Sequence, residues 1–486
     1  MSTLSRVLLP LVVCALTLTP GIKTGKAEPE IILPDFGDPS DALISPSEDR
    51  ELGAAFFRDL HGRLKINQDP EIQSFIQSLG HRLSANSDNP QHPYFFFVVL
   101  EPSINAFAGP GGYIGIHSGL ILVSETESEL SSVIAHEIAH ITQRHLYRAF
   151  DAASRLSLPT AAAMLAAILI GTQSPELGSA ALIAAQAGNI QAQINFTRDN
   201  EQEADRIGMQ TLARSDFDPR SMPTFFERLQ QSSRFYGKGP PEFLRTHPVT
   251  TSRISDTRGR ANAYPYRQSS DSMTYLLIKA KIRVLSEEKP EQTIKQFSAL
   301  LDQGTTDQQA ANRYGLALAH LANRNFASAR AQLRSLIQQY PRISHFASAL
   351  AKTELESKNY DTALKYYAKA MEEFPDNDAV TLDYVQTLLK ANKPAKAQKI
   401  ISRYNRSHTP ALLTYELLAQ AYGDLGKKAE SHRYVAEYYY LSGNTHAAIV
   451  QTKIALKNVK GSFYLNAILE ERLKKFMTEE KLRKQK

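Results

Sequence analysis

A pattern that returns every 34 residues in the second half of the chain restricts the fold more than any other feature. An aromatic residue or proline is followed three positions later by alanine. The matching pairs are Phe326 with Ala329, Tyr360 with Ala363, and Pro394 with Ala397. A repeat of this length holds two helices and buries its apolar face only against neighbouring repeats. The second half is therefore predicted to form an all-α solenoid.

This pattern resembles the tetratricopeptide repeat, in which small residues lie in the second helix and proline stands near the end of a unit. Pro341 and Pro375 match the position of that proline. The resemblance implies a tetratricopeptide-repeat domain over residues 269–460, followed by a C-terminal helix and basic tail over residues 461–486. Repeat solenoids often bind other proteins, although a helical stack without a ligand fits the same pattern.

The first 27 residues are typical of a secretory signal peptide. Arg6 precedes an apolar run from Val7 to Leu18, and small residues flank Lys26 before a cleavage site after Ala27. A membrane anchor is the alternative, but the apolar run of about 12 residues is short of the roughly 20 that span a bilayer. We expect export through a cleaved signal (residues 1–27), followed by an extended mature N-terminus (residues 28–46).

Charge and cysteine content limit the possible partners. The chain has 56 basic and 50 acidic residues, and cleavage of the signal would leave a net charge of about +3, too small to indicate a nucleic-acid partner. The same cleavage would remove Cys14, the only cysteine. The mature chain would then have no disulfides and no thiolate metal ligands in an oxidising compartment.

Residues 47–268 are predicted to form a mostly helical α+β domain with a small sheet. Apolar residues at helical spacing indicate helices, a continuous aromatic run indicates a strand, and the glycine-rich segment 109–112 indicates a turn. The expected elements are helices over 47–63 and 70–83, strands over 94–100, 106–108 and 113–116, and one long helix over 125–148.

Residues 156–195 are rich in alanine, leucine and isoleucine, and Glu176 is their only charged residue. A transmembrane hairpin is one interpretation. However, each half is short of a comfortable span, and polar side chains occupy much of the second half. The segment is therefore predicted to form two helices that cover the active site and touch a membrane surface.

The segment from His136 to His140 reads His-Glu-x-x-His and carries the chemistry. On a helix, residues four apart share one face, so both imidazoles can bind one Zn²⁺ while Glu137 takes a proton from the metal-bound water. Zinc lowers the pKa of that water towards about 7. Two histidines can share an exposed helix by chance, but Ile134 and Ile138 place this motif on an amphipathic helix.

The third metal ligand must come from elsewhere in the chain. Metzincins have glycine and histidine where this chain has Gln143 and Leu146, so that class is excluded. Glu201 and Asp205 are four residues apart in a predicted helix. One can bind the metal while the other supports a metal-bound histidine; Asp205 is the candidate for support and for donating a proton to the leaving amine. Two other acids compete for these roles, Asp199 and Glu203.

The pattern His-Glu-x-x-His followed by Glu-x-x-Ala-Asp resembles the gluzincin peptidases of the Ste/Oma/HtpX superfamily. The segments 105–112 and 247–254 match that superfamily as well. The resemblance covers roughly residues 45–260 and implies a zincin-like metalloprotease fold with one Zn²⁺ per chain. It also implies the following roles: His136, His140 and Glu201 as metal ligands, Glu137 as the catalytic base, and Asp205 as a supporting acid or proton donor.

Two further segments have a functional and an ordinary interpretation. Asn105–Ala108 is either an edge strand that pairs with an extended substrate or a plain sheet strand. His247 lies in a proline-flanked loop, where a satisfied surface histidine is common. Alternatively, it is a regulatory fourth ligand that fills the open zinc position.

A signal peptide, this peptidase and C-terminal repeats together resemble superfamily members of the Gram-negative periplasm that assist outer-membrane protein assembly. This implies a zinc endopeptidase with a chaperone-like role in assembly and quality control of outer-membrane β-barrel proteins. Its expected partners are misfolded or stalled barrel proteins and, through the repeats, the β-barrel assembly machinery. The alternative is a chaperone or binding module in which the repeats dominate and proteolysis is rarely used.

Overall fold

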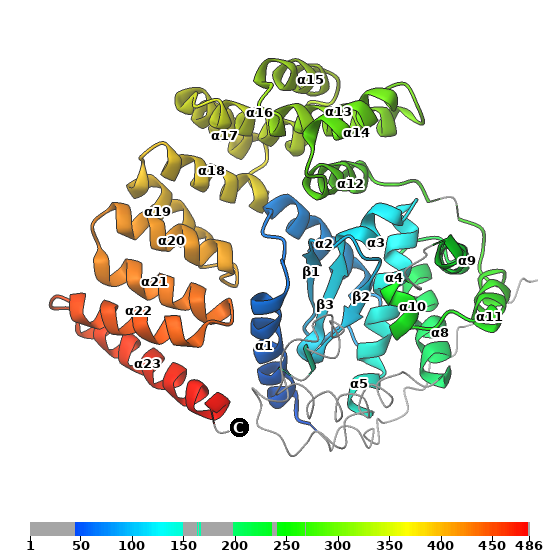
Figure 1. The fold of residues 1–486 in the computed structure, drawn as a ribbon, viewed down its shortest axis with the longest axis horizontal. Coiled ribbons are helices and arrows are strands. Elements are labelled where there is room, and N and C mark those ends of the chain that lie inside the picture. Colours follow the sequence, from blue (N-terminus) through cyan, green and yellow to red (C-terminus); the bar gives the residue numbers. More distant parts are fainter. Residues whose placement is uncertain are drawn as a thin grey trace, which may run out of the picture. The chain divides into compact units, whose positions relative to one another are not determined.

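The computed structural model describes residues 44–148, 163, 165, 166, 198–235, 241–267 and 269–484 (Figure 1). The predicted signal peptide and nearly all of the extended N-terminus lie outside the described residues, as does most of the apolar segment 156–195. Within the part of the chain that is described, no helix combines the length and apolar character needed to cross a membrane.

The two helices predicted near the start of the mature chain form with strong N-terminal caps. Helix α1 (Pro46–Arg63) begins at a capping box, in which Ser45 Oγ accepts the Glu48 N–H at 3.2 Å and Glu48 accepts the Ser45 N–H at 2.9 Å. Helix α2 (Pro70–Ser84) begins at Asp69, whose carboxylate accepts two backbone N–H groups.

The sheet has three strands in the order β1 (Phe95–Val99), β3 (Tyr113–His117) and β2 (Ala106–Ala108). Strand β3 pairs parallel with β1 and antiparallel with β2. The turn between β2 and β3 requires glycine: Gly111 and Gly112 have φ of 68° and 80°, and a Cβ at Gly112 would collide with the Pro93 carbonyl. The strand order places β2 at an edge of this sheet, which is the first of the two interpretations left open by the sequence.

The helix predicted over 125–148 is wrong as a single element. This span instead forms α4 (Glu127–Thr142) and a short α5 (His145–Arg148), and a separate helix α3 (Ser118–Val123) precedes them. Arg144 adopts a left-handed conformation with φ of 53°, which ends the helical hydrogen bonding after α4. Neither glycine nor proline stands at this break, so it could not be predicted from local sequence signals.

Helix α4 lies between the sheet and the helices α8 (Arg198–Arg214) and α9 (Ser221–Phe235) (Figure 1). Every residue of α4 up to His140 is buried. Helices α10 (Glu242–Thr246) and α11 (Thr251–Ala261) follow in the described part of this domain. Its main core brings together apolar residues from α2, the sheet, α4, α8 and α9, and so holds the His-Glu-x-x-His helix rigidly.

Gly208 sets how closely α8 approaches α4. A Cβ at this position would lie 3.0 Å from both the backbone N and the Cα of His136. Gly208→Ala is expected to push the helices apart and lower the free energy of unfolding by about 1–3 kcal/mol, as overpacking does. The matched control is Gly259→Ala at an exposed position of α11, where a Cβ meets nothing within 4 Å.

Urea unfolding of the two glycine variants separates crowding from helix propensity. Gly259→Ala is expected to raise stability by about 0.5–1 kcal/mol, because alanine is the better helix former. An equal gain at Gly208 would show that α8 and α4 are not in tight contact.

The second half of the chain is the predicted tetratricopeptide-repeat solenoid. Its helices pair in sequence (Figure 1), and the 34-residue period also appears in the backbone, since left-handed residues recur at Arg324, Lys358, Asn392 and Gly426. The helices are α12 (Met273–Ser286), α13 (Pro290–Ala299), α14 (Thr306–Ala322), α15 (Phe326–Gln339), α16 (Ser344–Glu356), α17 (Tyr360–Glu373), α18 (Asp378–Lys390), α19 (Pro394–Tyr404), α20 (Leu412–Asp424), α21 (Lys428–Leu441), α22 (Thr445–Asn458) and α23 (Phe463–Lys484). The predicted fold class is confirmed.

Helix α12 belongs to both cores. Tyr275 and Ile278 pack in the peptidase core, whereas Leu277 and Ala280 pack in the first repeat core. The N-termini of α12 and α4 also exchange hydrogen bonds: the Glu127 N–H donates to Asp271 at 2.7 Å, and the Ser272 N–H donates to Glu127 at 2.8 Å. The first repeat helix, α12, therefore supports the start of α4, the helix that carries the His-Glu-x-x-His motif.

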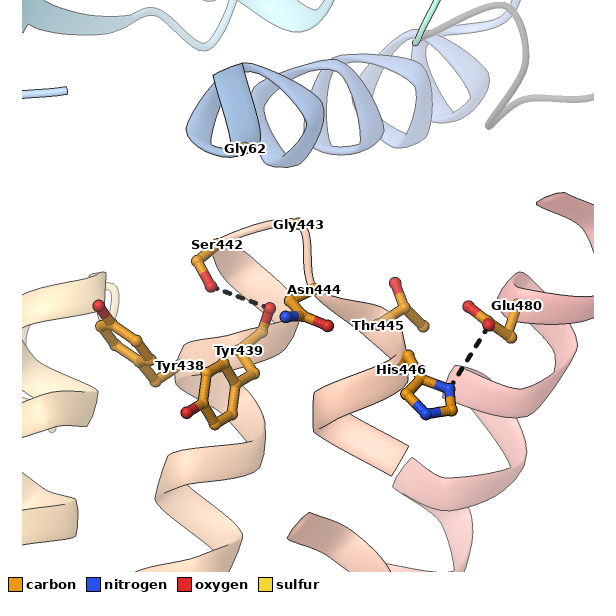
Figure 2. A pocket seen from close by; sticks show the side chains of 9 residues that line it. All are labelled: Gly62, Tyr438, Tyr439, Ser442, Gly443, Asn444, Thr445, His446 and Glu480. Atoms are coloured by element: carbon orange, nitrogen blue, oxygen red, sulfur yellow. Dashed lines mark hydrogen bonds and ion pairs between the residues drawn. The ribbon is translucent and has the colours of Figure 1, made fainter. Parts of the chain in front are cut away.

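The C-terminal repeats meet α1 around a small polar pocket (Figure 2). It has a volume of about 520 Å³ and is lined by Gly62 of α1, by the turn from α21 to α22 and by Glu480 of α23. Gly443, with φ of 83°, approaches α1 so closely that a Cβ would collide with the Arg58 carbonyl. Arg58 also forms a 3.2 Å ion pair with Glu479 of α23.

Candidate active site

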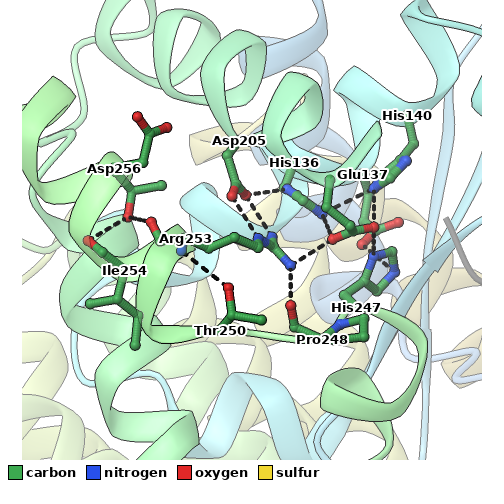
Figure 3. Close-up of polar contacts among 12 residues, drawn as sticks. His136, Glu137, His140, Asp205, His247, Pro248, Thr250, Arg253, Ile254 and Asp256 are labelled. Atoms are coloured by element: carbon green, nitrogen blue, oxygen red, sulfur yellow. Dashed lines mark hydrogen bonds and ion pairs between the residues drawn. The ribbon is translucent and has the colours of Figure 1, made fainter. Parts of the chain in front are cut away.

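Four buried side chains converge at the centre of the peptidase domain: His136 and His140 of α4, Glu201 of α8, and His247 after α10. Figure 3 labels the three histidines. Each offers one ligand atom, and these atoms all lie within 4.8 Å of one another. None of the four residues is more than 2% exposed. The structure therefore brings together the three metal ligands that the superfamily resemblance implies, together with the fourth candidate.

The spacing of these atoms suits a tetrahedral metal ion. The Nε2 atoms of His136 and His140 are 3.0 Å apart, and each lies 3.5 Å from a carboxylate oxygen of Glu201. Bonds of about 2 Å in a tetrahedral zinc site place neighbouring ligand atoms roughly 3.3 Å apart. Imidazole nitrogens and a carboxylate are the usual zinc donors, so the residues present fit the ion.

Glu137 lies beside the cluster and is 1% exposed. Its Oε1 is 3.5 Å from His247 Nε2, and the backbone N–H of Ala108 in the edge strand β2 donates a hydrogen bond to it. Burial raises the pKa of Glu137. A carboxylate whose pKa is closer to neutral is a more effective general base at neutral pH.

Asp205 lies directly behind His136. Its Oδ1 is 3.0 Å from His136 Nδ1, and both of its oxygens accept hydrogen bonds from Arg253, at 2.7 and 2.8 Å (Figure 3). Burial opposes ionisation of Asp205, but the hydrogen bonds from His136 and Arg253 outweigh it and lower its pKa. This geometry suits the supporting role better than that of proton donor, because the carboxylate stays ionised and is fully engaged.

Arg253 is the largest contribution to the site that the sequence did not reveal. Its side chain is 1% exposed, and its Nη1 lies 2.7 Å from Glu201 Oε2. One guanidinium thus holds both the candidate metal ligand Glu201 and the supporting acid Asp205. The sequence showed Arg253 only as part of a superfamily motif. The signal that could have pointed to it is the spacing of Glu201 and Asp205, because two neighbouring carboxylates that become buried need a cation between them.

The protonation of the two motif histidines follows from these neighbours. Burial opposes charge on His136, but the carboxylates of Asp205 and Glu201 outweigh it and raise its pKa to about 9. Burial and the charge on His136 together hold the pKa of His140 well below its usual value. The carboxylates therefore compensate positive charge on this pair, as they would compensate a bound cation.

The two competing acids lie apart from the four-residue cluster. Asp199 is exposed, and Glu203 is 31% exposed and contacts His145 instead, with 3.1 Å between Glu203 Oε2 and His145 Nε2. His145 is fully buried, and its Nδ1 lies 2.8 Å from His140 Nδ1. Sequence reasoning missed His145 because it placed this residue on a continuous helix.

Short contacts hold His247 towards the cluster. It caps α10, where its N–H donates to the Phe243 carbonyl at 2.7 Å, and the Phe243 N–H donates to Ile104 beside β2 at 3.1 Å. Arg253 also donates to the Pro248 carbonyl at 2.9 Å. His247 Nδ1 contacts Glu201 Oε1 at 2.9 Å. The residue predicted to be on a proline-flanked loop is thus buried inside the site.

Comparison with known proteins agrees with this arrangement. Residues 70–261 match the model of peptidase family M48, and residues 289–378 and 354–421 match tetratricopeptide-repeat models. The β-barrel assembly-enhancing protease of Yersinia pestis is 35% identical over 429 residues, which cover 88% of each protein. The chain belongs to the β-barrel assembly-enhancing protease family. That of Escherichia coli K12 is also 35% identical, again over 88% of each protein.

Other proteins match a smaller share of this family member. The mitochondrial metalloendopeptidase OMA1 of Schizosaccharomyces pombe is 31% identical over 182 residues, covering 37% of this chain and 50% of that protein. A solved tetratricopeptide-repeat protein from Parabacteroides merdae is 15% identical with a TM-score of 0.30, covering 58% of this chain and 93% of that one. Membership of this family places the chain among metalloendopeptidases and confirms the prediction of a metalloendopeptidase from the sequence.

Proposed function

We propose that this chain is a zinc-dependent endopeptidase of the bacterial periplasm that acts on misfolded or stalled outer-membrane β-barrel proteins. One observation carries the proposal: a buried His-His-Glu cluster with Glu137 beside it, in a chain that matches β-barrel assembly-enhancing proteases along nearly its whole length. A periplasmic location agrees with the predicted signal peptide at residues 1–27.

His136, His140 and Glu201 would hold the ion. Two imidazoles and one carboxylate favour zinc over harder cations such as magnesium or calcium, which prefer oxygen ligands. When bound, zinc polarises the scissile carbonyl and makes water a stronger acid. One zinc ion per chain fits the single cluster of this kind found among the described residues.

Glu137 would move the proton during hydrolysis. It takes a proton from the attacking water and can then deliver it to the leaving amine. Asp205 would act as a positioning residue, because its contact with Nδ1 fixes the ring of His136 and leaves Nε2 facing the cluster. The edge strand β2, which donates to Glu137 through Ala108, would pair with an extended substrate.

His247 would act as a regulatory fourth ligand that fills the open coordination position. Its place in the cluster supports this role. We expect His247→Ala to raise basal cleavage of unfolded casein while zinc content stays unchanged, because the three other ligands remain. Wild-type or lower basal cleavage would instead give His247 a structural or transition-state role.

The tetratricopeptide repeats (residues 269–460) would dock the β-barrel assembly machinery or the client protein. The stacked helices α12 to α22 support this, since such solenoids present extended binding surfaces. Residues 47–268 would form the catalytic domain. Within it, the segment 156–195 would cover the active site and touch the membrane surface. The alternative function is a chaperone in which binding by the repeats dominates.

A cellular experiment separates these two functions. Bacteria that lack their own family member would express either the wild-type chain or Glu137→Gln, and stalled and assembled outer-membrane barrels would be followed by electrophoresis. Removal of stalled barrels is expected with the wild type only. If Glu137→Gln removes them equally well, proteolysis is not the main function and the chaperone interpretation is favoured.

A further inference from the structure

Three polar side chains contact one another in series between the active site and the surface of the peptidase domain: His140, His145 and Glu203. His145 Nδ1 lies 2.8 Å from His140 Nδ1, and His145 Nε2 lies 3.1 Å from Glu203 Oε2. His145 is fully buried, whereas Glu203 is 31% exposed. The mechanism above uses neither of them, yet the contact is made to the ring nitrogen of His140 that faces away from the cluster.

The backbone is shaped to make this contact. On a continuous helix, a residue five positions beyond His140 would lie about 140° around the axis and point away from it. The left-handed Arg144, with φ of 53°, ends α4 and turns the chain, so that α5 starts at His145. A non-glycine residue adopts this conformation at some cost, and here the turn brings one imidazole against another.

The donor and acceptor roles in this series of contacts follow from the residues at its two ends, Glu203 and His140. A carboxylate only accepts, so His145 Nε2 must donate to Glu203. In a neutral imidazole the other nitrogen then accepts, so His145 Nδ1 accepts a hydrogen bond from the Nδ1–H group of His140. This is the assignment that leaves the lone pair of His140 Nε2 directed at His136 and Glu201. With the opposite assignment, His140 would carry its proton on Nε2 and could not bind an ion.

We propose that His145, with its tautomer fixed by Glu203, is the positioning residue for metal binding by His140. It corresponds to Asp205, which contacts Nδ1 of His136 at 3.0 Å, so each motif histidine has its own support. The inference rests on the proposed function, because it takes His140 as a ligand. Partners of this kind typically contribute 10–100-fold to metal affinity.

The test measures the zinc dissociation constant of the full chain by competition with a chromogenic chelator. His145→Leu is expected to weaken zinc binding by about 10–100-fold. His145→Asn places an amide oxygen near the position of Nδ1 and is expected to restore most of the affinity, which a purely structural role would not predict. Glu203→Ala is expected to weaken binding less, since His145 can still accept. Asp199→Ala, which removes an exposed acid of the same helix, is the matched control.

Because Glu203 acts on zinc binding through His145, the effects of changing the two residues on zinc affinity should not add. The double variant His145→Leu/Glu203→Ala is expected to bind zinc no more weakly than His145→Leu alone. Nitrogen NMR of histidine-labelled protein should show a proton on Nδ1 of His140 in the zinc-bound wild type. This readout and Glu203→Ala keep the test decisive if His145→Leu does not fold.

Wild-type affinity in both His145→Leu and Glu203→Ala would overturn the inference, as would equal losses in His145→Leu and His145→Asn. His140→Ala separates this failure from failure of the metal site itself. If His140→Ala loses zinc while His145→Leu keeps wild-type affinity, only the supporting role is wrong. If His140→Ala also keeps wild-type affinity, the proposed zinc site is wrong.

Discussion

Replacing Glu137 with glutamine is expected to abolish peptide hydrolysis while the metal stays bound. Glutamine keeps the size of the side chain but cannot take a proton from water, and general bases of this kind contribute about 10²–10⁴-fold to the rate. The expected loss is therefore at least about a hundredfold in the rate of casein cleavage. His136, His140 and Glu201 are untouched by the change, so metal content should match the wild type.

The control for this variant is Asp199→Asn, which also neutralises one carboxylate but at an exposed position on α8. It should cleave casein at the wild-type rate. Full activity of Glu137→Gln would exclude Glu137 as the base. Loss of metal from Glu137→Gln would mean that Glu137 is needed to hold the ion, which this site geometry does not predict.

Replacing Arg253 with methionine is expected to cause the largest loss of stability among single changes at the site. The guanidinium is 1% exposed and pairs with both Asp205 and Glu201, which are themselves at most 2% exposed. Removing one partner of a buried ion pair typically costs 3–5 kcal/mol, because it leaves uncompensated buried charge. Urea unfolding in the presence of a chelator measures this cost without the contribution of bound metal.

Arg258→Met on the same helix is the matched control. Arg258 is 60% exposed and pairs with Glu227, and exposed pairs contribute only about 0–1 kcal/mol. Arg253→Lys should fall between the wild type and Arg253→Met, since lysine keeps the charge but cannot form the two parallel hydrogen bonds. Equal costs at positions 253 and 258 would show that Arg253 does not hold the two acids in place.

Periodic features of the sequence predicted most of the fold. The 34-residue step placed the repeat helices because each repeat buries the same small residues, and Ala329, Ala363 and Ala397 are indeed fully buried. The motif helix was predictable for a similar reason, since a buried helix carries apolar residues such as Ile134 and Ile138 around its two histidines. Local patterns of this kind do not depend on how the chain closes in space.

The features that the sequence did not show all depend on tertiary contacts. The left-handed Arg144 has no glycine to announce it, so the turn that brings His145 to His140 could not be predicted. Arg253 is far along the chain from Asp205, and only the folded packing of α11 on α8 joins them. Likewise, α12 falls within the predicted repeat domain, although Tyr275 packs in the peptidase core.

The proposed activity requires one zinc ion bound between His136, His140 and Glu201. Anomalous diffraction from crystals of the zinc-loaded full chain, recorded at the zinc absorption edge, tests it most directly. We expect a single strong anomalous peak within about 2.0–2.3 Å of ligand atoms from these three residues. A peak at any other group of residues, or none in zinc-loaded crystals, would show that these three residues do not hold the zinc ion.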